Sequence, residues 1–242
     1  MRIAFFSGGP LGTDWLKLLS GLALAGFVLG LALALIYAPT NTVQGEVQRI
    51  FYLHLAAFVG AFVGFISAAI GGVAYLRTRR IAWDMFAQAG VEVGLLLALI
   101  NVLTGAIYAR PIINSWWTWD PKLTAVTIMM LTYTAYLMLR NGVESPERRR
   151  LFAAVYSIIA FVTVINTFMA IRLRPDTLHE VMFAPGSALF RMPARMQLAL
   201  FGNMLIWGGL IAPALIGWRF RLERFYLANE RLRFRLLDGE RR

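Results

Sequence analysis

The chain has 242 residues and a formal net charge of +11, and 59% of its residues are hydrophobic while 15% are charged. Soluble proteins average roughly 45–50% apolar and about 25% charged residues, so this composition excludes an ordinary soluble domain and indicates a membrane protein. So high a positive charge would suggest nucleic-acid binding in a soluble protein. Here the charges lie in the loops between apolar segments, and we expect no nucleic-acid partner.

Six segments are long and apolar enough to cross a bilayer as helices. About 20 apolar residues span the hydrocarbon, and a spanning segment must satisfy its backbone polar groups internally because no water is available there. The first segment is longer than the core of a signal peptide and lacks a cleavage pattern, so we expect it to be retained. We therefore predict an all-α polytopic membrane protein, with a six-transmembrane-helix bundle over residues 1–218. The predicted spans are 18–38, 50–76, 85–109, 123–139, 151–171 and 196–218.

The positive charges are distributed unevenly between the two sides of this bundle. Most of the 24 Lys and Arg residues lie before the first span, in the second and fourth loops, and after Trp218. Because cytoplasmic loops carry the excess of Lys and Arg, this distribution predicts that both termini are cytoplasmic. Residues 219–242 interleave arginines with apolar residues, and we expect a basic amphipathic cytoplasmic tail that lies on anionic lipid.

The sequence has two histidines, and the predicted topology places both on the outer side. His54 lies at the start of the second span, and His179 lies in the loop between the fifth and sixth spans. A single interfacial histidine often only caps a helix or faces water, but two that face one site are suited to bind iron from opposite sides of a macrocycle. Zinc fits less well, because a structural zinc site needs four ligands and the chain has no cysteine.

Three of the seven tryptophans fall within four residues of the third loop, at Trp116, Trp117 and Trp119. Interfacial tryptophans usually occur singly at helix ends, whereas three together provide a flat apolar surface for a planar ligand. Asp120 and Pro121 follow at once, and we expect Asp120 to cap the next helix with proline at its first position. The outer side is therefore predicted to hold a site for a flat ligand.

Two polar residues of the third span are weaker candidates. A charge inside the membrane costs about 2.5–3.5 kcal/mol on insertion scales, so we expect Glu92 to face the bundle interior in its protonated form. Glu92 and Asn101 would otherwise line the path of a transporter subunit. No phosphate-binding loop is present in the sequence, and we expect a binding and transfer protein that is not an enzyme.

The chain resembles the haem exporter protein C family (CcmC) of the cytochrome c maturation system over most of its length. The resemblance rests on Thr104-Gly105, on Tyr108, and on the segments 49–54, 116–124 and 177–179. The sequence departs from the family at four places. Tyr108 replaces a usual tryptophan, Ala109 a glycine, Ile113-Asn114 a Trp-Gly pair and Lys122 an arginine.

The resemblance implies a protein of the bacterial inner membrane that holds haem b at the outer face for cytochrome c biogenesis. It implies delivery to a membrane-anchored haem chaperone, within a complex of ATP-binding cassette subunits and a small membrane subunit. By the same resemblance His54 and His179 are the axial ligands, the tryptophans hold the ring, and Asp120 orders the loop or contacts a partner. The implied haem-binding residues are His54, His179, Trp116, Trp117, Trp119, Asp120, Tyr108 and Lys122.

Two other functions are alternatives. A cytochrome b-type electron-transfer subunit also binds haem, although such subunits place paired histidines within helices. A transporter subunit would depend on Glu92 rather than on the histidines. The haem lyase of the other bacterial maturation system shares the Trp-rich loop but has more spans and more histidines than this chain.

Overall fold

The fold is known from a computed structural model, which describes residues 10–174, 177–179, 181, 184 and 186–240. In this part of the chain six helices are long and apolar enough to cross a membrane, and no strand is present beyond one isolated bridge between Asn41 and Gly45. The prediction of an all-α, six-span membrane protein is confirmed. The spans are Trp15–Tyr37, Gln48–Thr78, Ile81–Ile113, Pro121–Gly142, Pro146–Leu173 and Ala194–Asn229.

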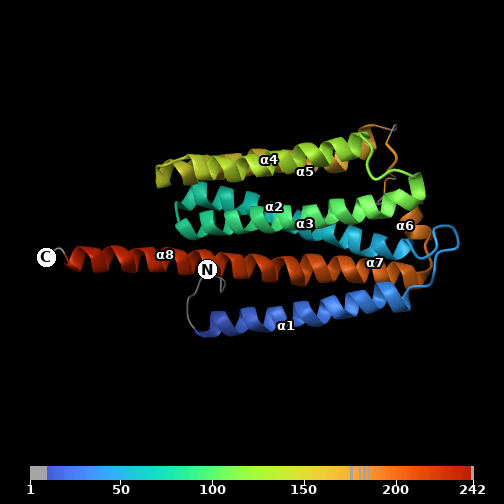
Figure 1. The fold of residues 1–242 in the computed structure, drawn as a ribbon, viewed down its shortest axis with the longest axis horizontal. Coiled ribbons are helices and arrows are strands. Elements are labelled where there is room, and N and C mark those ends of the chain that lie inside the picture. Colours follow the sequence, from blue (N-terminus) through green and yellow to red (C-terminus); the bar gives the residue numbers. More distant parts are fainter. Residues whose placement is uncertain (1–9, 175–176, 180, 182–183, 185, 241–242) are drawn as a thin grey trace.

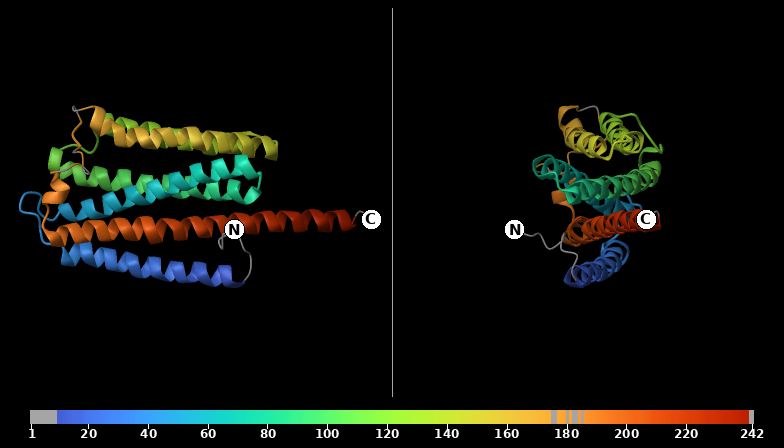
Figure 2. Two further views of the ribbon diagram at one scale, coloured as in Figure 1. Left: turned by 180° about the vertical axis from the view of Figure 1, so that it is seen from behind. Right: turned by 90° about the vertical axis from the view of Figure 1, so that its left-hand side faces the viewer.

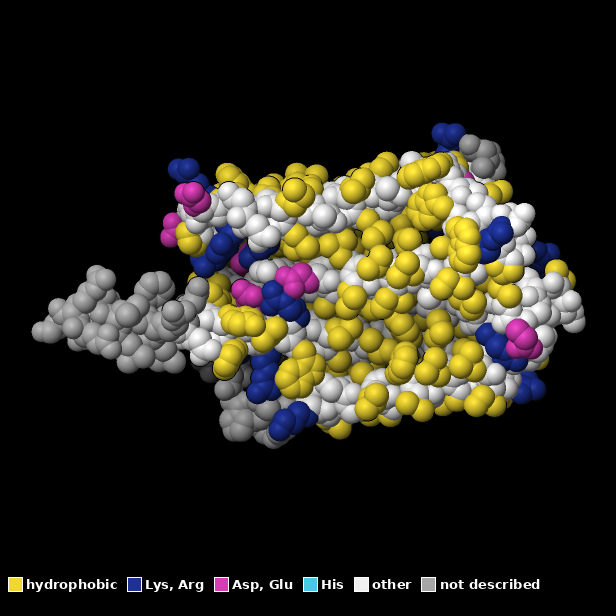
Figure 3. Space-filling view, in the orientation of Figure 1, with side chains coloured by type: hydrophobic (Ala, Val, Ile, Leu, Met, Phe, Trp, Pro, Cys, Tyr) yellow, Lys and Arg dark blue, Asp and Glu magenta, His cyan; other side chains and the backbone are white. Residues whose placement is uncertain are grey.

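The spanning helices form successive layers. The pair α4 and α5 lies on the pair α2 and α3, followed by the long helix of α7 and α8 and then by α1 (Figures 1 and 2). The central part of the surface is apolar, and charged side chains gather toward the two ends of the bundle (Figure 3). The helices are α1 (Pro10–Ala32), α2 (Gln48–Thr78), α3 (Ile81–Ile113), α4 (Pro121–Gly142), α5 (Pro146–Leu173), α6 (Ala188–Arg191), α7 (Ala194–Ile206) and α8 (Ala212–Glu240), with π-helical turns η2 (Leu33–Tyr37) and η3 (Trp207–Ile211).

Small residues allow α2 and α3 to lie against each other. A Cβ atom added at Gly64 would lie 2.6 Å from the Cα of Gly94, and one added at Gly71 would lie 2.9 Å from the Cβ of Ala87. Close backbone approach of this kind favours helix association in membranes. The two helices therefore form a rigid central pair, and their ends at Gln48 and Ile113 define one end of the bundle.

The sixth span is not one regular α-helix. The π-turn η3 lies just before Pro213, which has no N–H to donate and whose ring would clash with the carbonyl four residues earlier. After this turn α8 runs without interruption to Glu240 and projects beyond the other helices (Figures 1 and 2). No helix boundary marks the predicted division between residues 218 and 219, and contact of the tail with anionic lipid stays a prediction.

Buried ion pairs join the helices at the end opposite to the start of α2. Arg140 of α4 donates to both carboxylate oxygens of Asp84 of α3, at 2.6 and 3.0 Å, and Arg150 of α5 lies 3.9 Å from the same carboxylate. Asp84 and Arg140 are both buried. Their charges therefore compensate each other inside the bundle.

Replacing Asp84 by asparagine is expected to lower the free energy of unfolding by about 3–5 kcal/mol, because it leaves the buried Arg140 without its counter-charge. Thermal or denaturant unfolding of the purified chain in detergent measures the change. Glu144→Gln is the matched control, since Glu144 is exposed near the same end and its loss should cost less than about 0.5 kcal/mol. Equal effects of the two substitutions would show that the pair does not stabilise the fold.

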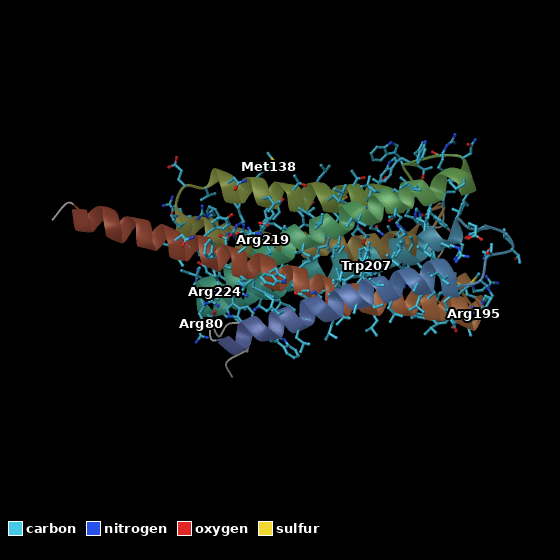
Figure 4. All side chains as sticks on the ribbon, turned by 60° about the horizontal axis from the view of Figure 1, so that its bottom comes forward. Arg80, Met138, Arg195, Trp207, Arg219 and Arg224 are labelled. Carbon is cyan, nitrogen blue, oxygen red and sulfur yellow. The ribbon has the colours of Figure 1, made fainter. Side chains whose placement is uncertain are left out.

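Glu92 faces the neighbouring helix α8, and it has a charged partner there that the sequence did not suggest. It is half-buried and pairs with Arg219 of α8, whose Nε and Nη2 atoms donate to its two oxygens, and the amide of Gln88 donates to it at 2.8 Å. Figure 4 shows Arg219 on α8, on the same side of the bundle as Arg80 and Arg224 and far from Arg195. The tail helix therefore supplies a counter-charge for Glu92 that hydropathy cannot reveal.

Candidate functional site

A cavity of about 400 Å³ lies at the end of the bundle where α2 begins and α3 ends. Its walls come from α2, α3, the first turns of α4, and the loops before α4 and after α5. The volume is within the range of roughly 300–1,000 Å³ that is typical of small-molecule sites. Predicted site residues that line it are His54, Tyr108, Trp116, Trp117, Lys122 and His179.

His54 lies in the second turn of α2 and is fixed by the neighbouring helix α3. Its Nδ1 atom is 2.8 Å from the backbone carbonyl of Asn101, and the side-chain amide of Asn101 donates to the His54 carbonyl at 2.8 Å. The Asn101 side-chain nitrogen is also 3.1 Å from Nδ1, but it donates to the nearer His54 carbonyl, and the Asn101 carbonyl can only accept. The shorter contact therefore assigns the proton to Nδ1 and leaves the lone pair on Nε2. Among the described residues nothing forms a hydrogen bond with Nε2, which is thus available for a ligand.

Gly105 of α3 allows this approach of the two helices. A Cβ atom at Gly105 would lie 2.8 Å from Cε1 of the His54 ring, which is too close for a real contact. The sequence analysis assigned no role in the site to Gly105 or to Asn101. The signal for Asn101 was an amide within an apolar span, which is costly unless the amide has a partner.

Asp120 connects His179 to the start of α4. Its Oδ1 atom accepts the Leu123 N–H at 2.8 Å, so the predicted helix cap with proline in the first turn is confirmed. Its Oδ2 atom accepts from Nδ1 of His179 at 2.8 Å and from Leu178 N and Thr177 Oγ1, both at 3.2 Å. Asp120 is 8% exposed and does not line the cavity, so it acts through His179.

The electrostatics of this pair favour a neutral imidazole beside a carboxylate. Burial lowers the pKa of His179 below its ordinary value, the Lys122 charge lowers it further, and the Asp120 hydrogen bond opposes both. Burial alone would raise the pKa of Asp120, but the hydrogen bonds from Leu123 and His179 together lower it. At neutral pH Nδ1–H of His179 therefore points to the carboxylate and Nε2 is left unprotonated.

The three tryptophans of the third loop do not all lie at the cavity. Trp116 and Trp117 line the cavity, whereas Trp119 is 72% exposed and packs edge-on against Trp117 with ring centroids 5.7 Å apart. The Trp117 carbonyl accepts from Ser115 Oγ at 2.8 Å, which holds the loop in shape. The three rings thus do not form one continuous platform, and Trp119 faces outward.

The polar residues of the cavity wall include one cation. Lys122 lines the cavity, and its Nζ atom lies 5.8 Å from the centroid of the Phe58 ring. Tyr108 packs against Phe51 and donates its hydroxyl proton to Gln44 at 2.8 Å. A largely apolar cavity with an ammonium group in its wall suits a flat ligand that carries carboxylates.

The donor set can be compared directly with haem. Among the described residues no group of three or more His, Cys, Asp or Glu side chains could hold a metal ion. Two imidazoles complete the coordination of an iron ion only where a macrocycle supplies the other ligands. Two open Nε2 atoms, indole walls and a lysine therefore fit haem better than a free metal ion.

These features define a multi-pass membrane protein with a ligand cavity at one end of its helix bundle. The family model described as "Heme exporter protein C" (CcmC) matches residues 9–223, and the chain belongs to this family.

Individual relatives agree with the family model. The chain is 29% identical over 196 residues to a heme exporter protein C of Paracoccus denitrificans, covering 78% of this chain and 79% of that protein. It is 26% identical over 153 residues to a heme exporter protein C of Escherichia coli K12, covering 63% and 60%. It is also 29% identical over 113 residues to a ccmC-like mitochondrial protein for cytochrome c biosynthesis of Marchantia polymorpha, covering 47% and 50%.

Proposed function

We propose that this protein binds haem b in the cavity, with His54 and His179 as axial ligands, and passes it on for cytochrome c maturation. One observation carries the proposal. The two imidazoles come from distant parts of the chain, line the same cavity and have Nδ1 bonded to an acceptor, and no described residue forms a hydrogen bond with either Nε2 atom. Metal-binding histidines in proteins usually have this arrangement, because the second hydrogen bond fixes the tautomer and the ring orientation.

The other residues bind and orient the ligand. Trp116 and Trp117 supply the flat apolar walls, Tyr108 closes one side of the cavity, and Lys122 faces the carboxylates. Haem, when bound, supplies the iron and the planar ring. We assign no catalytic step to the chain, whose role is to bind haem and to transfer it.

The proposed topology places the cavity on the outer side of the inner membrane and both termini in the cytoplasm. The distribution of Lys and Arg supports this orientation, since Arg80, Arg219 and Arg224 gather at the end opposite to the cavity (Figure 4). Family membership supports the proposed partners, which are a membrane-anchored haem chaperone, ATP-binding cassette subunits and a small membrane subunit. The basic tail would contact anionic lipid at the cytoplasmic side.

An absorption spectrum of the detergent-purified chain, oxidised and reduced, tests the proposal. We expect a haem spectrum typical of two axial histidines, and release of this haem to a chaperone protein in the same detergent. A haem that is oxidised and reduced rapidly by quinol but never transferred would instead support a cytochrome b-type subunit. A haem-free chain that loses transport activity in the Glu92→Gln variant would support a transporter subunit.

The different environments of Trp117 and Trp119 lead to a separate prediction. Trp117→Ala is expected to weaken haem binding by about 10-fold. Stacking of a planar ring on an aromatic side chain contributes about 1–3 kcal/mol, and a 10-fold loss lies at the lower end of that range. Trp119→Ala should leave haem affinity within about 2-fold while slowing transfer to the chaperone, because Trp119 faces outward. Haem titration and transfer assays of both variants distinguish the roles, with Trp218→Ala at the opposite end as control. Equal loss of affinity in all three variants would return the tryptophans to a general interfacial role.

A further inference from the structure

We propose that the two histidines are built as unequal iron ligands, with His179 the stronger donor and His54 the weaker. This inference rests on the proposed function, because it concerns how each ring would bind the same iron. It follows from the hydrogen-bond partner of each Nδ1 atom. One partner carries a charge and the other does not.

The partner of His179 is a carboxylate. Asp120 Oδ2 accepts the Nδ1 proton at 2.8 Å, and the same carboxyl group is held by Leu123, Leu178 and Thr177. A carboxylate that accepts the Nδ1 proton draws it away from the ring and makes Nε2 a stronger electron donor. These further contacts hold the Asp120 carboxylate beside the His179 ring.

The partner of His54 is a neutral carbonyl that has other donors. The Asn101 carbonyl lies 2.8 Å from Nδ1 of His54 and 3.0 Å from the hydroxyl of Thr104. Hydrogen bonds to charged acceptors are roughly twice as strong as those between neutral groups. The His54 ring is therefore well oriented but less polarised than the His179 ring.

The two sides of the cavity consequently differ in how readily each histidine is replaced. An external ligand should displace His54 first, while His179 stays bound. A protein that must hold haem and also release it needs one bond of each kind. His54 lies on the rigid α2–α3 pair, and its weaker bond is thus set by its acceptor rather than by mobility.

Two measurements test the inequality. Each single substitution leaves one histidine as the protein ligand. This is His179 in the His54→Gly chain and His54 in the His179→Gly chain. We expect the ferrous iron–histidine stretching frequency, measured by resonance Raman spectroscopy, to be higher in the His54→Gly chain. Adding Asp120→Asn to this chain should lower the frequency, since the Asn oxygen can still cap α4 while an amide nitrogen, which cannot accept the Nδ1 proton, replaces the charged Oδ2 atom.

The second measurement uses the chain with both histidines. Carbon monoxide should replace His54 on the reduced haem and leave His179 opposite to it. Asp120→Asn is then expected to shift the C–O stretching frequency, whereas Asn101→Ala is not. Glu46→Gln is the matched control, because it neutralises an exposed carboxylate that pairs with Arg49 and Thr40 near the same end and contacts neither imidazole.

The outcomes separate this inference from the proposed function. If replacing either histidine leaves the haem spectrum unchanged, the ligand assignment itself fails. If the histidines are ligands but the two frequencies are equal or reversed, only the inequality fails. Should a single-histidine chain retain no haem, the carbon monoxide measurement decides. A C–O frequency that does not respond to Asp120→Asn would overturn the inequality.

Discussion

Replacing His54 or His179 by glycine is expected to weaken haem binding by more than about 10–100-fold. Loss of a partner that only orients a metal ligand already costs this factor, and each substitution removes a ligand itself. Added imidazole should restore much of the binding, because it fits the space that the side chain leaves and supplies the same nitrogen. Haem titration of the purified chains, with and without imidazole, measures both effects.

The same variants should remain folded and inserted in the membrane. Neither imidazole contributes to the buried core of the bundle, and the rings of both residues are only half-buried. Helix content in detergent should therefore match that of the parent chain, and the unfolding temperature should fall only slightly in the His54→Gly chain, since a glycine within α2 costs about 0.5–1 kcal/mol. An unchanged Soret band in the chain that lacks both histidines would refute the ligand assignment.

The Gly105→Ala variant is expected to bind haem more weakly, although neither proposed iron ligand is replaced. The added methyl group would lie 2.8 Å from Cε1 of His54, so the imidazole must move away from its place over the cavity. Overpacking of this kind costs about 1–3 kcal/mol, which corresponds to about 5–150-fold in affinity. Haem titration measures the loss, and the absorption spectrum should show a weakened axial ligand.

Gly21→Ala is the matched control for that substitution. Gly21 lies in the membrane-spanning part of α1, and a Cβ atom there would meet nothing within 4 Å. The same chemical change at Gly21 should leave haem binding unaffected and should stabilise the helix slightly. Unaltered affinity in the Gly105→Ala variant would mean that His54 adapts freely and is not held by α3.

Most of the fold could be predicted from the sequence because each membrane helix requires a long run of apolar residues. The six apolar runs correspond to the six spans, and most of the helix ends lie a few residues outside the predicted runs. The cap at Asp120 was also predictable, since an N-terminal aspartate followed by proline acts within a single turn. These signals are local, and each depends on residues close together in the chain.

The contacts that organise the cavity could not be predicted in this way. Asn101 bonds to a histidine 47 residues earlier, and Asp120 bonds to one 59 residues later. Arg219 similarly pairs with Glu92 across 127 residues. Hydropathy gives the depth of a residue in the membrane but not its partner on another helix. The outward orientation of Trp119 was hidden for the same reason.

The position of Asp120 has a consequence for how this protein can evolve. The Asp120 carboxylate caps α4, holds the segment Thr177–His179 and bonds to the His179 imidazole, so all three depend on this one group. A change at residue 120 would disturb all of them together, and a change at 177–179 is acceptable only if it preserves the bond to Asp120. The two loops therefore cannot diverge independently, and among descendants of this sequence they should be inherited as one unit.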